Sequence, residues 1–211
     1  MLKIDLADPA RAENSLMAAF EEASPLSQVE GLELASRVRN SRQWMDTFDG
    51  VLCLIPTRPF LELLAKLVQE GRHRVVVEVG AGYGLIRLAF QQTTLLEGVS
   101  YHATDVLPRN QVVESFSHEE AVEKYRPSLV ISSWPPPRIA LSWPQEWEEL
   151  GVREYLAIVP RGSYGEYSLW AKELADPLPG WERVNFKEMT KVTVDTYGCL
   201  SRCYLFRKEV S

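Results

Sequence analysis

The feature that most constrains the fold is the stretch RVVVEVGAGYGLIRLAF, residues 74–90. Its first part, residues 75–79, is a short run rich in valine, which is typical of a strand buried on both faces of a parallel sheet. Three glycines follow at alternate positions: Gly80, Gly82 and Gly84. Glycines let the backbone turn sharply and lie against a ligand with no Cβ in the way. The apolar residues 85–90 predict a buried helix, so the stretch predicts a strand, a glycine loop and a helix that hold a nucleotide-like cofactor.

Length, charge and hydropathy exclude several classes of protein. A chain of 211 residues is long enough for one ordinary domain with a sizeable core. The formal net charge of −6 makes nucleic acid an unlikely partner, since phosphate binding depends on clustered Lys and Arg. No apolar run approaches the roughly 20 residues that span a bilayer, so we expect no membrane association and a cytoplasmic protein. The three cysteines are too few and too irregular for a disulfide framework or a zinc site, and no metal site is predicted.

The segments before the organising strand are predicted to be helical. Residues 1–48 carry apolar stripes at helical spacing and are interpreted as an N-terminal helical extension or lid. Residues 49–211 form the cofactor-binding domain. Within it, the segment IPTRPFLELLAKLV predicts a helix that begins beside a proline and ends at Gly71.

An acidic residue lies at the distance from the glycines that ribose binding requires. A second strand, from Val99 to Thr104, leads to Asp105, which lies 21 positions after Gly84. In nucleotide-binding α/β units an acid at the end of the second strand, about 20 residues past the glycines, accepts hydrogen bonds from ribose hydroxyls.

The rest of the chain predicts further strands and helices in alternation. Ser117 and Glu120 form a capping box at the start of a helix. Strands are predicted at residues 111–115, 128–133 and 151–160, with a helix at 165–176. The tail from residue 181 has two segments of period 2 with no room for a helix between them, which predicts an antiparallel pair at the sheet edge.

The glycine spacing separates two classes of cofactor. A dinucleotide fingerprint, G-x-G-x-x-G, would place its third glycine at position 85, where this chain has Leu85. Glu78 precedes the first glycine, and an acid there is awkward beside a pyrophosphate. It suits a cofactor whose tail carries an ammonium group.

These motifs resemble those of a known superfamily. EVGAGYG is similar to the E/D-x-G-x-G-x-G signature of class I S-adenosylmethionine-dependent methyltransferases, and ATD resembles their ribose-binding acid. More narrowly, IPTRPFLELLAKLV, EVGAGYG, ATDVLP and SSWPPP resemble an uncharacterised methyltransferase-like family with a W-P-P loop after the fourth strand. The resemblance covers about residues 50–208. It implies an α/β, Rossmann-like class I methyltransferase fold: a mostly parallel seven-stranded sheet with an antiparallel last strand and helices on both faces.

The resemblance also implies which residues form the site. The cofactor S-adenosylmethionine would be bound by Glu78, Gly80, Gly82, Gly84, Asp105, Ser115, Phe116 and Ser133. Glu78 would hold the methionine end, Asp105 the ribose, and Ser115 and Phe116 the adenine. The methyl acceptor would be contacted by Trp134, Pro135 and Pro136, in the loop after the fourth strand. Apart from the resemblance, Tyr164 is a candidate acceptor contact because it lies in the loop after the fifth strand.

No general base is evident among the three histidines. His73 lies in a charged turn and is expected to be solvated, His102 lies in the second strand, and His118 opens a helix. The favoured hypothesis is a methyltransferase acting on an unidentified small-molecule or protein acceptor. The alternative is a non-catalytic S-adenosylmethionine-binding protein or partner subunit. A nicotinamide dehydrogenase ranks third because of Leu85 and Glu78.

Overall fold

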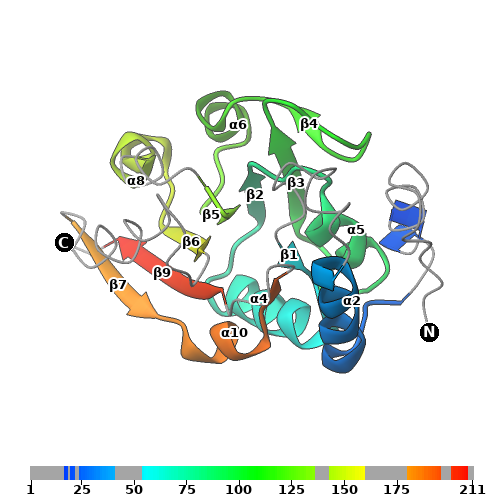
Figure 1. Cartoon of the computed structure of the whole chain (residues 1–211). Helices are drawn as coiled ribbons and strands as arrows, with labels where there is room; N and C mark the ends of the chain where they lie inside the picture. Colours follow the sequence, from blue (N-terminus) through cyan, green and yellow to red (C-terminus); the bar gives the residue numbers. More distant parts are fainter. Residues whose placement is uncertain are drawn as a thin grey trace.

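A seven-stranded sheet forms the centre of the molecule (Figure 1). The computed structural model describes residues 17–18, 20–21, 24–40, 54–135, 143–159, 180–195 and 201–208. Strand order is β4-β3-β2-β5-β6-β9-β7. The strands are β2 (Val75–Val79), β3 (Ser100–Asp105), β4 (Glu114–Ser115), β5 (Leu129–Ser133), β6 (Glu154–Val159), β7 (Trp181–Asn185) and β9 (Arg202–Lys208).

Strand directions confirm the predicted fold class. The ladders β4–β3, β3–β2, β2–β5 and β5–β6 are parallel, whereas β9 runs antiparallel to both of its neighbours, β6 and β7. This is the mostly parallel sheet with a reversed last strand that the resemblance implied.

One prediction for the tail is wrong. A short helix, α10 (Lys187–Val192), and a two-residue strand, β8 (Val194–Asp195), lie between β7 and β9. The strand β8 pairs antiparallel with β1 (Leu54–Ile55) to form a second, two-stranded sheet. The tail therefore supplies more than the predicted edge pair, because it returns to the segment that precedes the first long helix of the domain.

Helices cover both faces of the sheet. One core cluster joins the sheet to α2 (Gln28–Asn40), α4 (Arg58–Glu70) and α5 (Leu85–Gln91), and the other joins it to α6 (His118–Tyr125), α8 (Trp143–Glu146) and the turn η1 (Glu148–Leu150) (Figure 1). Alternate residues of one strand enter opposite clusters: Val76 belongs to the first, and Val77 and Val79 to the second. This follows from the period of 2 along a strand and explains why β2 and β5 are apolar for most of their length.

Local signals account for two of these helices. Pro59 lies in the first turn of α4, where its missing N–H costs nothing, and Gly71 ends the helix. Gly71 is also required sterically, because a Cβ at this position would collide with the ring of His73. The capping box of α6 is present, with Ser117 and Glu120 each bonded to the other's backbone N–H.

The described part of the N-terminal extension packs on the domain. Leu34, Ala35 and Val38 of α2 belong to the same core cluster as α4. Leu26 and Thr57 pair in an isolated parallel β-bridge. No helix in the described ranges combines the length and apolar character needed to cross a bilayer. The predicted helix at 165–176 lies outside the described residues.

The prediction that His73 is solvated is wrong. His73 is 3% exposed and lies just before β2. Its Nδ1 is 2.7 Å from the Ser128 hydroxyl, and its Nε2 is 2.9 Å from the Glu154 carboxyl, whose other oxygen accepts from Arg207 at 2.8 Å. These residues tie together the amino ends of β2, β5 and β6 and the carboxyl end of β9.

This network makes a prediction for stability. We expect His73→Ala to lower the free energy of unfolding by roughly 2–4 kcal/mol, because Glu154 and Ser128 lose a buried partner. The half-buried His102, which binds the more exposed Glu114, is the matched control, and His102→Ala should cost less than half as much. Urea denaturation measures both. Equal losses in the two variants would contradict a special role for His73.

Candidate functional site

The glycine loop between β2 and α5 has a backbone that only glycine adopts without strain. The φ angles of Gly80, Gly82 and Gly84 are +67°, +53° and +69°. Side-chain-bearing residues rarely take this left-handed conformation. A Cβ at Gly84 would also lie 2.7 Å from the side chain of Val113. The path of the loop therefore favours glycine at all three positions, and the space around the loop also requires it at Gly84.

Asp105 fastens this loop to the end of β3. Its Oδ2 accepts a hydrogen bond from the Gly82 amide at 2.8 Å, and its Oδ1 accepts one from the Leu107 amide at 2.9 Å. The Ala81 amide donates to the carbonyl of Thr104 at 2.9 Å. Each carboxylate oxygen keeps a second lone pair, so Asp105 can still accept from a ligand hydroxyl.

A cavity of about 160 Å³ opens at the carboxyl ends of β2, β3 and β5, where ligands of open α/β sheets bind. Its lining residues come from β1, the glycine loop, α5 and the ends of these strands: Leu54, Glu78, Gly80, Ala81, Gly82, Tyr83, Leu85, Ile86, Asp105, Ser133 and Trp134. The ionisable carboxyl groups in this lining belong to Glu78 and Asp105, and among the described lining residues there is no Lys, Arg or His. The described lining therefore offers acceptors to a cationic or hydroxyl-bearing ligand and no cation to a phosphate.

Glu78 is a buried acid at the wall of this cavity. It is 2% exposed, and its Oε2 accepts a hydrogen bond from the Tyr101 hydroxyl at 2.9 Å. Burial raises the pKa of Glu78 to about 8, the charge of Asp105 adds to this rise, and the Tyr101 hydrogen bond opposes it. Burial likewise raises the pKa of Tyr101 well above its usual value, so Tyr101 remains a donor. A cation beside Glu78 would favour its ionised form.

Ser133 and Trp134 form the wall at the end of β5. The Oγ of Ser133 is buried and has no hydrogen-bond partner among the described residues. Trp134 has a φ of +55°, a conformation that is strained for a bulky residue. Its amide donates to the Ile158 carbonyl at 2.7 Å, and its indole N–H donates to Ser201 Oγ at 3.1 Å. An unpartnered hydroxyl and a strained backbone at one wall are typical of a ligand-binding edge.

The structure brings together most of the predicted site residues. One cavity is lined by six of them: Glu78, Gly80, Gly82, Asp105, Ser133 and Trp134. Gly84 lies outside this lining and precedes α5. The predicted adenine contacts lie beside it: Ser115 is exposed and pairs with Asp105 across the β3–β4 ladder, and Phe116 packs edge-on against Tyr125. Pro135 is buried next to Trp134 but does not line the cavity. Pro136 and Tyr164 lie outside the described residues.

Several lining residues were missed by the motifs. Leu54 reaches the cavity because β1 pairs with β8, a contact between segments about 140 residues apart in the chain. Tyr83 and Ile86 occupy variable positions of the glycine motif and the helix after it. Tyr101 does not line the cavity, but its hydroxyl donates to Glu78, and the sequence pattern of β3 did not indicate this contact.

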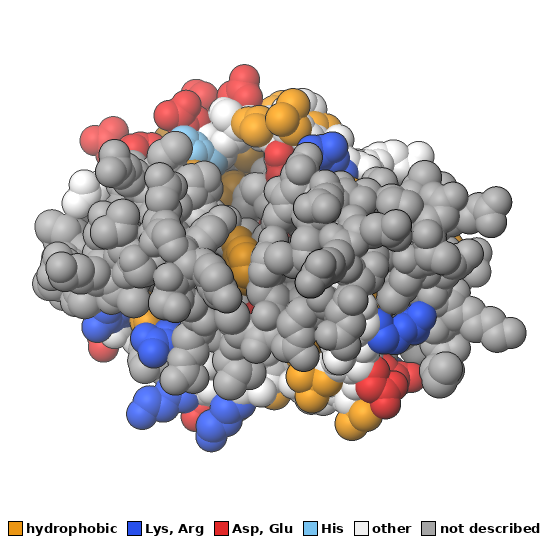
Figure 2. All heavy atoms as spheres, viewed as in Figure 1, with side chains coloured by type: hydrophobic (Ala, Val, Ile, Leu, Met, Phe, Trp, Pro, Cys, Tyr) orange, Lys and Arg blue, Asp and Glu red, His pale blue; other side chains and the backbone are white. Residues whose placement is uncertain are grey.

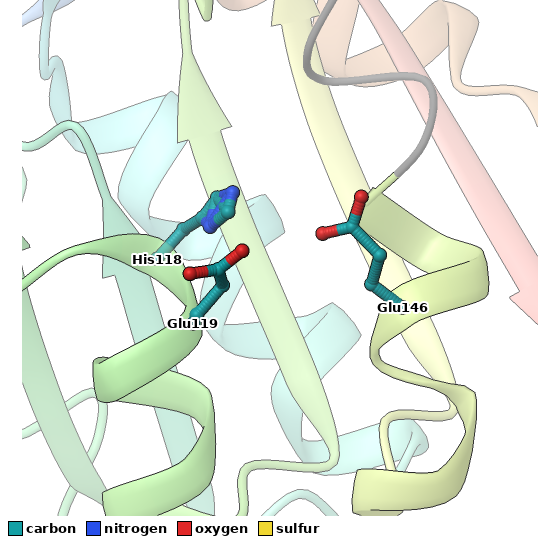
Figure 3. Close-up of side chains that lie close together, drawn as sticks. All are labelled: His118, Glu119 and Glu146. Carbon is teal, nitrogen blue, oxygen red and sulfur yellow. The ribbon is translucent and has the colours of Figure 1, made fainter.

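A second group of ionisable side chains lies away from the cavity lining. His118 and Glu119 of α6 and Glu146 of α8 point toward one another, with ligand atoms within 4.8 Å (Figure 3). Acidic side chains gather over these two helices (Figure 2). Both carboxylates of the trio are exposed, and acids in the first turn of a helix stabilise it through the helix dipole. We interpret the trio as solvated charge at these helix ends.

Comparisons with known proteins yield structural neighbours only. No protein-family model and no curated protein matches the chain. Among solved structures, cofactor-bound Rv0187 from MTB has a TM-score of 0.49 at 14% identity, covering 97% of this chain and 99% of that one. An SAH-bound methyltransferase of Podospora anserina, PaMTH1, has a TM-score of 0.48 at 10% identity, with coverages of 94% and 95%. An O-methyltransferase from Bacillus cereus in complex with SAH has a TM-score of 0.48 at 11% identity, with coverages of 84% and 90%.

Burial of Glu78 makes a prediction for the ligand-free protein. Because the folded state holds the Glu78 proton to about pH 8, whereas the unfolded chain releases it near pH 4.5, Glu78 destabilises the fold increasingly as the pH rises between these values. We expect Glu78→Gln to raise the free energy of unfolding at pH 7 by on the order of 2–3 kcal/mol. Thermal unfolding should show the two proteins to be alike at pH 4 and to diverge toward pH 8. A constant difference would contradict the raised pKa.

Proposed function

We propose that this protein is an S-adenosylmethionine-dependent methyltransferase that acts on a still unidentified small-molecule or protein acceptor. The observation that carries the proposal is a cavity beside a glycine loop of left-handed backbone, in whose described lining the charged side chains are two acids, Glu78 and Asp105. A dinucleotide brings a pyrophosphate, to which the described lining offers no Lys, Arg or His and which the Asp105 carboxylate would repel. S-adenosylmethionine brings a sulfonium, an ammonium and ribose hydroxyls, and each of these groups is complementary to an acid.

The residues of the cavity fit this cofactor. Within 4 Å of a Cβ built at Gly80 there is no atom of the described chain, so the backbone there is open to a ligand. The buried hydroxyl of Ser133 offers a polar partner. Glu78 would hold the ammonium of the methionine end, and Asp105 would accept from the ribose while it keeps the loop in place. When bound, the cofactor supplies an electrophilic methyl group on sulfur.

The protein itself would contribute in two ways: it would align the acceptor with the methyl group, and it would exclude water from the reacting end. Alignment of an acceptor lone pair behind a methyl group can supply about 7–11 kcal/mol of a reaction barrier in favourable cases. The strained Trp134 and the apolar Leu54 and Ile86 would restrict water at the reacting end. We assign no general base, since the described lining contains no histidine or lysine.

Calorimetric titration tests the cofactor assignment. S-adenosylmethionine and its product S-adenosylhomocysteine should both bind with 1:1 stoichiometry, and NAD should give no saturable heat. Binding of NAD without a response to either adenosyl compound would overturn the proposal. Turnover with candidate acceptors then separates the methyltransferase from the second candidate function, a non-catalytic S-adenosylmethionine-binding protein.

A matched pair of glycines tests whether the loop contacts the ligand. Gly80 and Gly98 both have positive φ angles, +67° and +79°, and a Cβ at either would meet no atom of the described chain within 4 Å. Only Gly80 lines the cavity. Gly80→Ala and Gly98→Ala should therefore cost similar stability, about 1 kcal/mol each.

Their effects on binding should differ. We expect Gly80→Ala to raise the Kd for S-adenosylhomocysteine by at least about tenfold, because the methyl group enters the ligand's space. Gly98→Ala should leave this Kd unchanged. Titration of both variants, with melting temperatures as the measure of folding, gives the comparison. Equal affinities in the two variants would show that the loop is structural only.

A further inference from the structure

A chain of hydrogen bonds leads from the cavity wall into the C-terminal part of the fold. The indole N–H of Trp134 donates to Ser201 Oγ at 3.1 Å, and Ser201 Oγ donates to Asp195 Oδ2 at 3.0 Å. Ser201 is fully buried and Asp195 is 3% exposed. The donors point in one direction, from indole to hydroxyl to carboxyl, so each bond polarises the next.

This chain is held by the second sheet. Asp195 lies on β8 and is paired with Leu54 of β1, which lines the same cavity as Trp134. Ser201 directly precedes β9, the reversed strand. The position of Trp134 is thus stabilised by two segments, those of Asp195 and Ser201, that contain none of the sequence motifs. The strained φ of Trp134 is maintained because its amide and its indole N–H are both bonded to other parts of the fold.

Electrostatics gives this arrangement a consequence for binding. The face of an indole ring is negative and attracts cations, and a hydrogen bond from the indole N–H to an acceptor increases the electron density of the ring. Here the acceptor is itself bonded to a buried acid. The carboxyl groups of the described lining belong to Glu78 and Asp105, and this lining includes no Lys, Arg or His, so the described part of the cavity favours a positive charge beside the ring.

We propose that Trp134, polarised through Ser201 and Asp195, recognises the positive charge at the reacting sulfur, so that the cavity prefers the charged methyl donor over the neutral product. This inference rests on the proposed function and deepens it. Trp134 contacts the cofactor, and Ser201 and Asp195 are positioning residues that act through it. Release of the product is favoured because the interaction ends when the charge is lost.

The test compares two ligands that differ only at sulfur. S-adenosylmethionine is a sulfonium and S-adenosylhomocysteine a neutral thioether, and both carry the same ammonium, carboxylate and adenosine. The ratio of their Kd values therefore cancels the contacts to the shared groups and leaves those to the charge and to the methyl group. Sinefungin, which carries an amine in place of the methylated sulfur, is a second cationic probe.

Two variants interrupt the chain in different ways. Ser201→Ala removes the bridging hydroxyl, and Asp195→Asn keeps the shape of the side chain while it removes the acid. We expect each to weaken S-adenosylmethionine and sinefungin binding by about 3–10-fold and to change S-adenosylhomocysteine binding by less than about twofold, as a cation–π contact in a partly desolvated site requires. The control is Ser128→Ala, which removes a serine hydroxyl bond at the opposite edge of the sheet and should not change the ratio.

The outcomes separate this inference from the proposed function. If wild-type protein binds neither adenosyl compound, the proposed function fails. If wild-type protein binds both compounds and the variants weaken both equally, or leave the ratio unchanged, the recognition of charge by Trp134 is overturned while the function stands. Should Ser201→Ala or Asp195→Asn fail to fold by circular dichroism, Trp134→Phe, which keeps a ring but has no N–H donor, provides the same comparison.

Discussion

The hydrogen bond from the Gly82 amide to Asp105 is the contact on which the site depends. It joins the loop after β2 to the end of β3, and it holds the three glycines in a left-handed path that places backbone, rather than side chains, at the cavity. Because Asp105 also accepts from Leu107, one carboxylate fixes the loop and the turn that follows β3. The Asp105 carboxylate therefore shapes the cavity and can still accept a hydrogen bond from a ligand.

The two edges of the sheet carry opposite kinds of polar chemistry. At the amino edge, His73, Ser128, Glu154 and Arg207 satisfy one another, so hydrogen bonds and charge lower the pKa of Glu154 despite its burial. At the carboxyl edge, burial of Glu78 with a single hydroxyl partner raises its pKa. The first arrangement stabilises the fold. In the second, burial disfavours the ionised form of Glu78, and a cationic ligand would offset that penalty. Of the two buried acids, Glu78 is therefore the one whose surroundings favour a ligand.

The strand, glycine loop and helix at residues 74–90 were predicted from local patterns, namely a run of valine and the glycine spacing, and the period of 2 in the tail predicted an antiparallel pair. The seven-stranded sheet with its reversed last strand was implied by the family resemblance of these motifs. Prediction from the sequence failed for contacts between distant segments. His73 bonds residues 55 and 81 positions away, and no local pattern distinguishes it from a solvated turn histidine. The six-residue helix α10 is too short for a helical period to be recognised between two strands. The bond from Trp134 to Ser201 spans 67 positions and depends on the register of β9.

The reversed strand explains why the wall of the cavity is built from both ends of the chain. Because β9 runs antiparallel to β6, it begins at the edge where the parallel strands end. Ser201, directly before β9, therefore lies beside Trp134 and accepts its indole hydrogen bond. A seventh parallel strand would begin at the opposite edge and would place that residue beside the His73 network instead. The direction of one strand therefore decides whether a buried acid, Asp195, can act on the cavity at all.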